Sequence, residues 1–346
     1  MHDALSKTNN VCITGVYGCI LPKDWDGEWH DSSDTTQDIT FSQSNNTVIG
    51  WSTTVPQFSS SVTSWTCVDY DPNNNLLLFQ SDQIVYPFTT VPTYINRCLK
   101  WEKLTEFSYT YLIYKVSLLS ITVVPANISS HCTVDDAFKP TAIETIVLVK
   151  KGYMKNAAQN CPTPFIGSFN YVFNNGSSTY CDDASVWDVC SNPTQMVVKY
   201  TLCSTTQFYS NGGVAYCAFS TSVGSTYYVT VINADSTVDF TTTFRFTCYA
   251  VNSSDGFVYA SDNKGACVPE QGPQTKLATG TGTLILSARA FKSASSQKNS
   301  NSYIGIVIGA IAGALVFAAA VLVFGMLLCK KYKARIFPDE HREDAV

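Results

Sequence analysis

Apolar and polar residues alternate along most of this 346-residue chain, with a period of two. Because successive side chains of a β-strand point to opposite faces, the pattern predicts half-buried strands. Segments of this kind, bounded by turn residues, lie at 38–43, 47–52, 76–80, 107–118 and 143–151. No helical period is sustained before residue 303, so we predict an all-β fold for that part of the chain.

Turn residues predict two hairpins in the second half of the chain. The first runs from 207–210 through Asn211-Gly212-Gly213 into 214–219, because Asn-Gly and Gly-Gly supply the positive φ that tight turns need. The second joins 227–232 to 241–250 over residues 233–236.

Residues 304–329 are apolar and uncharged, and Lys330, Lys331, Lys333 and Arg335 follow them directly. At about 1.5 Å per residue, such a helix exceeds the roughly 30 Å core of a bilayer. Basic residues hold their flank on the cytoplasmic side. We therefore predict a single-pass type I protein with a Ser/Asn-rich stalk at 292–302, a transmembrane helix at 303–329 and a cytoplasmic tail at 330–346.

Composition limits the kinds of protein to which the roughly 300 residues before the predicted membrane helix can belong. Charged residues make up 14% of the chain and its net charge is −5, without runs of one sign, which does not favour nucleic acid. A segment of this length exceeds what one core usually serves, so we expect two domains. Four sequons for N-glycosylation agree with an extracellular location, and they lie at Asn45, Asn127, Asn175 and Asn252.

Thirteen cysteines are present, and twelve precede the apolar run, as suits an oxidising compartment. The disulfide candidates are Cys12, Cys19, Cys67, Cys98, Cys132, Cys161, Cys181, Cys190, Cys203, Cys217, Cys248 and Cys267. Five precede residue 160 and seven follow it. Either one bridge joins the two groups, or Cys12 is lost with a remnant signal region at 1–18 and one later thiol stays free or pairs between chains. Spacing does not assign the connectivity.

A repeated pattern divides the extracellular part. Cys19-Ile20-Leu21-Pro22 precedes Gly27-Glu28-Trp29, and Cys161-Pro162-Thr163-Pro164 precedes Gly167-Ser168-Phe169. Each pattern opens a strand-rich unit, which predicts one β domain at 19–151, a junction at 152–160 and a second β domain at 161–291. We expect two tandem disulfide-stapled barrels or sandwiches.

Gly-x-Trp at the first strand resembles the lipocalin barrel, and that resemblance implies that Trp29 and Phe169 close the bases of two cups. A further resemblance rests on Trp187-Asp188-Val189-Cys190-Ser191-Asn192-Pro193, on Tyr200-Thr201-Leu202-Cys203-Ser204, and on Gly212-Gly213 to Cys217 and Phe246-Thr247-Cys248. These segments resemble a family of uncharacterised invertebrate, largely molluscan, type I membrane proteins with Cys-rich ectodomains of unknown function. The resemblance implies a topology and a disulfide framework, and no catalytic residue.

The sequence contains no convincing catalytic or metal motif. Its four histidines, His2, His30, His131 and His341, are widely separated, so we predict neither an enzyme nor a metal or cofactor site. Residues 69–80 begin like a calcium loop, but Asn74 and Gln80 stand where glycine and glutamate are needed, which favours a polar turn. Gly280-Thr281-Gly282 is interpreted as a turn before a strand.

The predicted membrane helix has features of its own. Gly305, Gly309 and Gly313 share one face and allow close packing of two helices, so a homodimer through this helix is a hypothesis. Cys329 at the inner boundary is a candidate for palmitoylation. The end of the chain, Asp344-Ala345-Val346, is similar to ligands of PDZ domains.

These observations predict a plasma-membrane glycoprotein with an extracellular N-terminus. We expect a recognition or adhesion module that binds a protein or glycan and performs no catalysis. The alternative is a membrane-tethered, lipocalin-like carrier of small apolar ligands. A cup lined by apolar side chains would favour the carrier, and cores filled by Trp and Tyr would favour the binding module.

Overall fold

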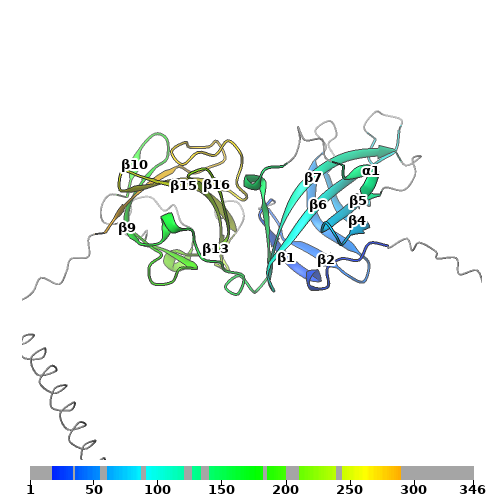
Figure 1. The fold of residues 1–346 in the computed structure, drawn as a ribbon, viewed down its shortest axis with the longest axis horizontal. Coiled ribbons are helices and arrows are strands. Elements are labelled where there is room, and N and C mark those ends of the chain that lie inside the picture. The colour runs from blue at the N-terminus through cyan, green and yellow to red at the C-terminus, as the bar shows by residue number, and fades with distance from the viewer. Residues whose placement is uncertain are drawn as a thin grey trace, which may run out of the picture. The chain divides into compact units, whose positions relative to one another are not determined.

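The computed structural model describes residues 18–289 except 34–35, 55–60, 87–90, 121–126, 134–139, 182–184, 200–209 and 239–243. These residues belong to one compact unit that ends at Arg289. Apart from the short helix α1 (Ile128–His131) and several 3-10 turns, their regular structure is antiparallel β-sheet (Figure 1). The all-β prediction is confirmed.

The first half of the unit is a closed eight-stranded barrel in which each strand pairs with the next along the chain. Strand β8 returns to pair with β1, with Trp29 opposite Lys150. The strands are β1 (Gly27–Asp31), β2 (Ile39–Ser42), β3 (Thr47–Thr54), β4 (Ser61–Asp71), β5 (Leu76–Ser81), β6 (Thr93–Thr105), β7 (Ser108–Ser120) and β8 (Ile146–Lys150).

The second half is also a barrel, because β17 pairs back onto β9 and closes the sheet. Strands β10 and β11 both pair with β9, and together they occupy the second strand position of the barrel. The strands are β9 (Ser168–Asn174), β10 (Thr179–Tyr180), β11 (Val186–Asp188), β12 (Gln195–Lys199), β13 (Val214–Val223), β14 (Thr226–Asn233), β15 (Phe246–Ser254), β16 (Phe257–Lys264) and β17 (Thr283–Ala288). The choice left open between barrel and sandwich is therefore decided for the barrel in both halves.

The two predicted hairpins have different outcomes. The pairing of the later one is confirmed, since β14 pairs with β15 and Tyr227 lies opposite Val251. Its return strand begins at Phe246 and not at residue 241, and 239–243 lie outside the described residues. Residues 207–209 of the earlier one lie outside the described residues. Its predicted pairing is contradicted, because β13 pairs with β12 and β14, and Asn211–Gly213 form a 3-10 turn that leads into β13. A turn motif states where the chain reverses, but it does not state which strand pairs with the next one.

The two barrels repeat one plan at equivalent positions. Each begins with a 3-10 turn preceded by a proline, η1 (Lys23–Trp25) and η4 (Thr163–Phe165), and each turn ends in a completely buried aromatic residue. A disulfide then joins the segment before this turn to the fourth strand, as Cys19–Cys67 and as Cys161–Cys217. Both fourth-strand cysteines lie at an irregularity in strand register.

The second bridge of each barrel follows the same rule. It joins the sixth strand to the segment between the seventh and eighth strands, as Cys98–Cys132 in the first barrel and as Cys248–Cys267 in the second. The repeat proposed from Cys, Pro and Gly-x-aromatic thus extends to the disulfide plan and the strand order.

Two apolar clusters contain residues of both barrels. In one, Val147 and Val149 of β8 and Ala157 of the connecting segment pack with Ala218, Ile232 and Phe246 of the second barrel. In the other, Ile143 packs with Tyr228, Cys248, Ala250 and Cys267.

Candidate functional site

The interior of the first barrel is filled by large aromatic side chains. Trp25 lies 4.7 Å from Phe41 and 5.5 Å from Tyr109, measured between ring centroids. Trp51 continues the series with Phe41 at 5.4 Å and Phe79 at 5.2 Å. All five rings are at most 1% exposed. Close-packed rings leave no free volume for a ligand at this level of the barrel.

Arg97 lies among these rings, although it is charged. The alternation of β6 puts Arg97 on the inner face between Ile95 and Leu99, and its side chain is 7% exposed. Its guanidinium lies 4.8 Å from the ring centroid of Trp65 and 5.4 Å from that of Trp51, and its Nη2 donates to Thr53 Oγ1. Two cation–π contacts offset part of the cost of burying this charge.

Asp31 at the end of β1 is the buried acid of the same barrel. Its carboxylate accepts hydrogen bonds from Trp51 Nε1 at 2.6 Å, Tyr111 OH at 2.6 Å and the Ser33 backbone N–H at 2.7 Å. Burial raises the pKa of Asp31 above its ordinary value, and these three donors oppose the rise. Burial also lowers the pKa of Arg97, which remains a cation because guanidinium does not deprotonate in proteins.

Sequence reasoning missed this network. A signal was present, because a charged residue at Arg97 interrupts the apolar inner positions Ile95 and Leu99 of a strand. Its partners could not be found, since Asp31, Trp51, Trp65 and Tyr111 belong to four other strands.

The interior of the second barrel contains a small cavity. Phe165 stacks on Trp187 at 5.3 Å, and Tyr249 meets Trp187 edge-on at 5.6 Å, measured between ring centroids. Beside these rings lies a cavity of about 50 Å³, lined by Trp187, Met196, Val198, Val231, Tyr249 and polar residues that include Asp262 and Thr281. This volume is large enough for only a few water molecules, whereas ligand pockets span about 300–1,000 Å³.

Asp262 is an acidic residue in the lining of this cavity. Its Oδ1 accepts from the backbone N–H groups of Thr281 and Gly282, both at 2.8 Å, and its Oδ2 accepts from Thr281 Oγ1. Burial raises its pKa, against these donors. A Cβ on Gly280 would lie 2.1 Å from the Asp262 carbonyl oxygen, so the glycines of this turn permit the close approach. The interpretation of Gly280-Thr281-Gly282 as a turn before a strand agrees with the position of β17.

The base aromatics predicted from Gly-x-aromatic lie inside their barrels. Trp29 is fully buried and its Nε1 donates to the Trp25 carbonyl at 2.7 Å, whereas Phe169 is 8% exposed. The two glycines that precede these aromatics have different surroundings, and at neither is a backbone atom among the nearest atoms that a Cβ would meet. Gly27 has open space and is required for its φ of +103°, and a Cβ on Gly167 would lie 2.7 Å from the ring of Phe169.

Among the described cysteines, eight form the four bridges given above and none of these bridges crosses between the barrels. Cys181 is also disulfide-bonded. Cys190 is a free, exposed thiol, so the structure corrects its inclusion among the disulfide candidates. Cys12 and Cys203 lie outside the described residues.

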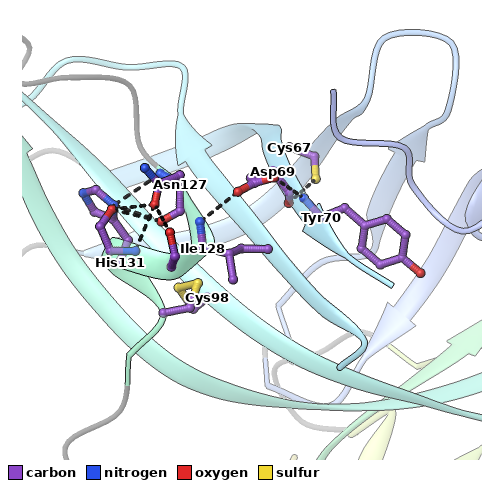
Figure 2. Close-up of a disulfide and its surroundings, with 10 residues drawn as sticks. Cys67, Asp69, Tyr70, Cys98, Asn127, Ile128 and His131 are labelled. Carbon is purple, nitrogen blue, oxygen red and sulfur yellow. Dashed lines mark hydrogen bonds between the residues drawn. A yellow bond between two sulfur atoms is a disulfide. The ribbon is translucent and has the colours of Figure 1, made fainter. Parts of the chain in front are cut away.

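The Cys98–Cys132 bridge holds α1 against β4 and β6, and Figure 2 shows its surroundings. Asn127 caps the helix, with its Oδ1 accepting from the Ser130 N–H at 2.9 Å. Asp69 of β4 accepts from the Ile128 N–H at 2.8 Å. Asp69 therefore helps to hold the start of α1 against β4. Asp71 accepts from the Asn73 and Asn74 backbone N–H groups, which is the polar turn that the sequence predicted.

The described histidines serve local structure. His30 is buried and its Nδ1 lies 2.5 Å from Asp38 Oδ1, whereas His131 contacts Ser130 and Asn127. Across the described ranges no three His, Cys, Asp or Glu side chains are grouped as metal ligands. His2 and His341 lie outside these ranges.

The four sequons occupy different settings. Asn45 lies exposed between β2 and β3, Asn127 is the exposed N-cap of α1, and Asn175 lies between β9 and β10. Asn252 is inside β15 and half-buried.

The predictions for the membrane segment concern residues 303–329, with Gly305, Gly309, Gly313 and Cys329, and lie outside the described residues. Within the part of the chain that is described, no helix is long and apolar enough to cross a bilayer.

Comparison with known proteins gives one match. A family model described as a domain of unknown function (DUF7042) matches residues 158–279, which run from the start of the second barrel through β16. No curated protein and no solved structure matches the chain. The description of the matched domain names neither an activity nor an organism, so a molluscan relationship stays a prediction.

Proposed function

We propose that this chain is a single-pass type I cell-surface glycoprotein whose two barrels act as an extracellular recognition or adhesion module without catalysis. The filled barrel interiors carry the proposal. Trp25, Trp29, Trp51, Trp65 and Trp187 are each at most 1% exposed. In the interiors as described, the cavity of about 50 Å³ in the second barrel is too small for an organic ligand of ordinary size. Binding is therefore assigned to the outer surface and the loops.

The disulfides support the cellular location. Four disulfides each join two cysteines of the same barrel. Disulfides of this kind are typical of proteins that fold in the secretory pathway. Asn45 and Asn127 are exposed and accessible to glycosylation. We also propose that the chain belongs to the invertebrate, largely molluscan, family that its Cys-rich segments resemble.

The test uses the full chain with one epitope tag at each end, expressed in animal cells. The N-terminal tag should be stained on intact cells and the C-terminal tag only after permeabilisation. Cross-linking on the cell surface, followed by mass spectrometry, should then enrich a protein or glycoprotein partner. A reversed staining pattern would overturn the topology, and a chain that cross-links to nothing above an unrelated membrane protein would overturn the recognition role.

The second candidate is a membrane-tethered carrier of small apolar ligands. The mostly apolar lining of the cavity in the second barrel favours it. Solvent extraction of the purified chain, with mass spectrometry of the extract, separates the two candidates. A lipid recovered in a one-to-one ratio would support the carrier, because such a ligand requires the cavity to expand.

A further inference from the structure

One row of side chains crosses four strands on the outer face of the second barrel. Asn252 of β15 lies opposite Tyr259 of β16, Tyr259 opposite Ile285 of β17, and Ile285 opposite Val172 of β9. Phe257 lies two residues from Tyr259 on the same face, with the ring centroids 6.4 Å apart. We call Val172, Phe257, Tyr259 and Ile285 the outer patch.

The outer patch faces solvent, although it is apolar. The alternate residues of the same strands, Val251, Val258 and Leu284, point inward and are at most 6% exposed. In contrast, Phe257 and Ile285 are each 42% exposed. The strand partners of Phe257 are Ser254 and Ser287, so no charge lies directly beside it. An uncharged apolar patch of this kind indicates a surface that another group covers.

Asn252 places a glycosylation site at the edge of this patch. Asn252-Ser253-Ser254 is a sequon, and among the four sequons it is the one that lies within a strand. Directly opposed residues in antiparallel strands have Cβ atoms about 4.5–5.5 Å apart, so the side chains of Asn252 and Tyr259 are neighbours. The Oδ1 of Asn252 is covered and has no hydrogen-bond partner. The Nδ2 of Asn252, the atom that carries a glycan, is not among the buried side-chain atoms that lack a partner.

We propose that the inner sugars of an N-glycan on Asn252 lie on the outer patch, with the C–H face of the sugar rings against Tyr259, Phe257 and Ile285. This proposal rests on the proposed function, because N-glycosylation requires the secretory pathway. A pyranose ring has an apolar face of axial C–H groups, and the electron-rich face of an aromatic ring attracts such groups. The covalent tether keeps the sugars close to the patch, so even a weak contact is occupied. An uncharged patch suits a neutral sugar.

The test begins with the occupancy of each sequon. The full chain is purified from animal cells, and glycopeptides that contain Asn45, Asn127, Asn175 and Asn252 are quantified by mass spectrometry. We expect Asn252 to be occupied. Occupancy of Asn45 and Asn127 without Asn252 would overturn this inference and leave the proposed function standing. Absence of glycans from all four sites would overturn both.

The second arm measures whether the glycan contacts the patch. Ser254→Ala removes the sequon and keeps Asn252, whereas Ser254→Thr keeps the sequon and serves as the matched control. Ser177→Ala removes the sequon of Asn175, which lies in an exposed turn, and controls for loss of a glycan in general. We expect Ser254→Ala to lower the melting temperature by about 2–4 °C, the shift that one contact of ordinary strength produces in a domain of this size. Both controls should stay near the parent.

The same substitution is then made in a Tyr259→Ser chain. If the sugars rest on the ring, Ser254→Ala should have little further effect in that background, because the two changes remove the same contact. An equal loss in both backgrounds, or no loss in the parent, would show that the glycan projects into solvent and would overturn the inference.

Discussion

At the scale of single residues, the buried acids set how this protein responds to pH. Asp31 is 2% exposed and takes part in no ion pair within the described residues. Its three donors stabilise the charged form, but the loss of solvation outweighs them and raises its pKa. The folded protein therefore retains a proton on Asp31 at a pH where the unfolded chain has released it.

The first prediction concerns Asp31→Asn, compared with the parent in protein refolded from bacteria, because the new asparagine forms an N-glycosylation sequon with Ser32 and Ser33. Between the ordinary pKa of 3.8 and the raised folded value, the folded state binds more protons, so this carboxyl makes stability fall as pH rises. The contribution is about 1.4 kcal/mol for each unit between the two pKa values. Asp31→Asn should flatten this slope, and urea unfolding from about pH 4 to 7 measures it. Asp255→Asn, at an exposed turn, is the control. A slope unchanged in Asp31→Asn would contradict the assignment.

The second prediction compares two aromatics of the second barrel. Phe165 is fully buried, stacks on Trp187 and meets Tyr249 at 5.7 Å, whereas Phe169 reaches the surface at 8% exposure. Phe165→Ala should cost about 3–5 kcal/mol of unfolding free energy, near the full value for a buried ring, and Phe169→Ala should cost less. Denaturant unfolding of both variants checks this order. A larger loss of unfolding free energy for Phe169→Ala than for Phe165→Ala would support the prediction that Phe169 closes the base of the second barrel.

At the scale of elements, the disulfides fix the segments that no strand pairing holds. Each barrel uses one bridge to hold its N-terminal 3-10 turn and a second to hold the connection before its last strand. Because a bridge acts mainly by restricting the unfolded chain, its contribution grows with the loop that it closes.

The third prediction uses this dependence. The Cys161–Cys217 bridge spans 56 residues and the Cys248–Cys267 bridge spans 19. Loop-closure entropy gives about 4 kcal/mol for the longer loop and about 3 kcal/mol for the shorter one. Paired Cys→Ser variants of each bridge should therefore differ by about 1 kcal/mol in urea unfolding, with the longer loop more costly to lose. The opposite order would show that local packing, and not the unfolded chain, controls the contribution of each bridge.

On the scale of the complete fold, two buried apolar clusters contain residues of both barrels, so we expect the two barrels to stabilise each other. Ala157 is 0% exposed and packs with residues of both barrels, and its neighbour Ala158 is only half-buried. A charge at Ala157 would lie in an apolar cluster without a partner.

The fourth prediction follows from this contrast. Ala157→Glu should separate one calorimetric unfolding transition into two, because the barrels lose the contacts that make them unfold together. Ala158→Glu is the matched control and should leave a single transition. One transition in both variants would mean that each barrel is held by other contacts, and two in the parent would mean that the barrels unfold independently.

The sequence by itself predicted the all-β fold and two tandem β structures, because these depend on local order: the period of two, the turn residues and the repeated Cys, Pro and Gly-x-aromatic pattern. Gly27 shows this well, since its positive φ is a property of one residue. The same locality explains the error at Asn211–Gly213, where a correct turn signal was joined to the wrong partner strand.

Which residues of distant strands become neighbours follows from the tertiary structure and could not be predicted from the sequence. Closure of each barrel pairs β1 with β8 and β9 with β17, which are separated by more than a hundred residues of chain. That closure puts Arg97 between two indoles, turns Asp31 toward Tyr111, leaves Cys190 without a bridge and sets Asn252 beside Tyr259. Register across a ring depends on the packing of all its strands at once, and no short segment of sequence contains that information.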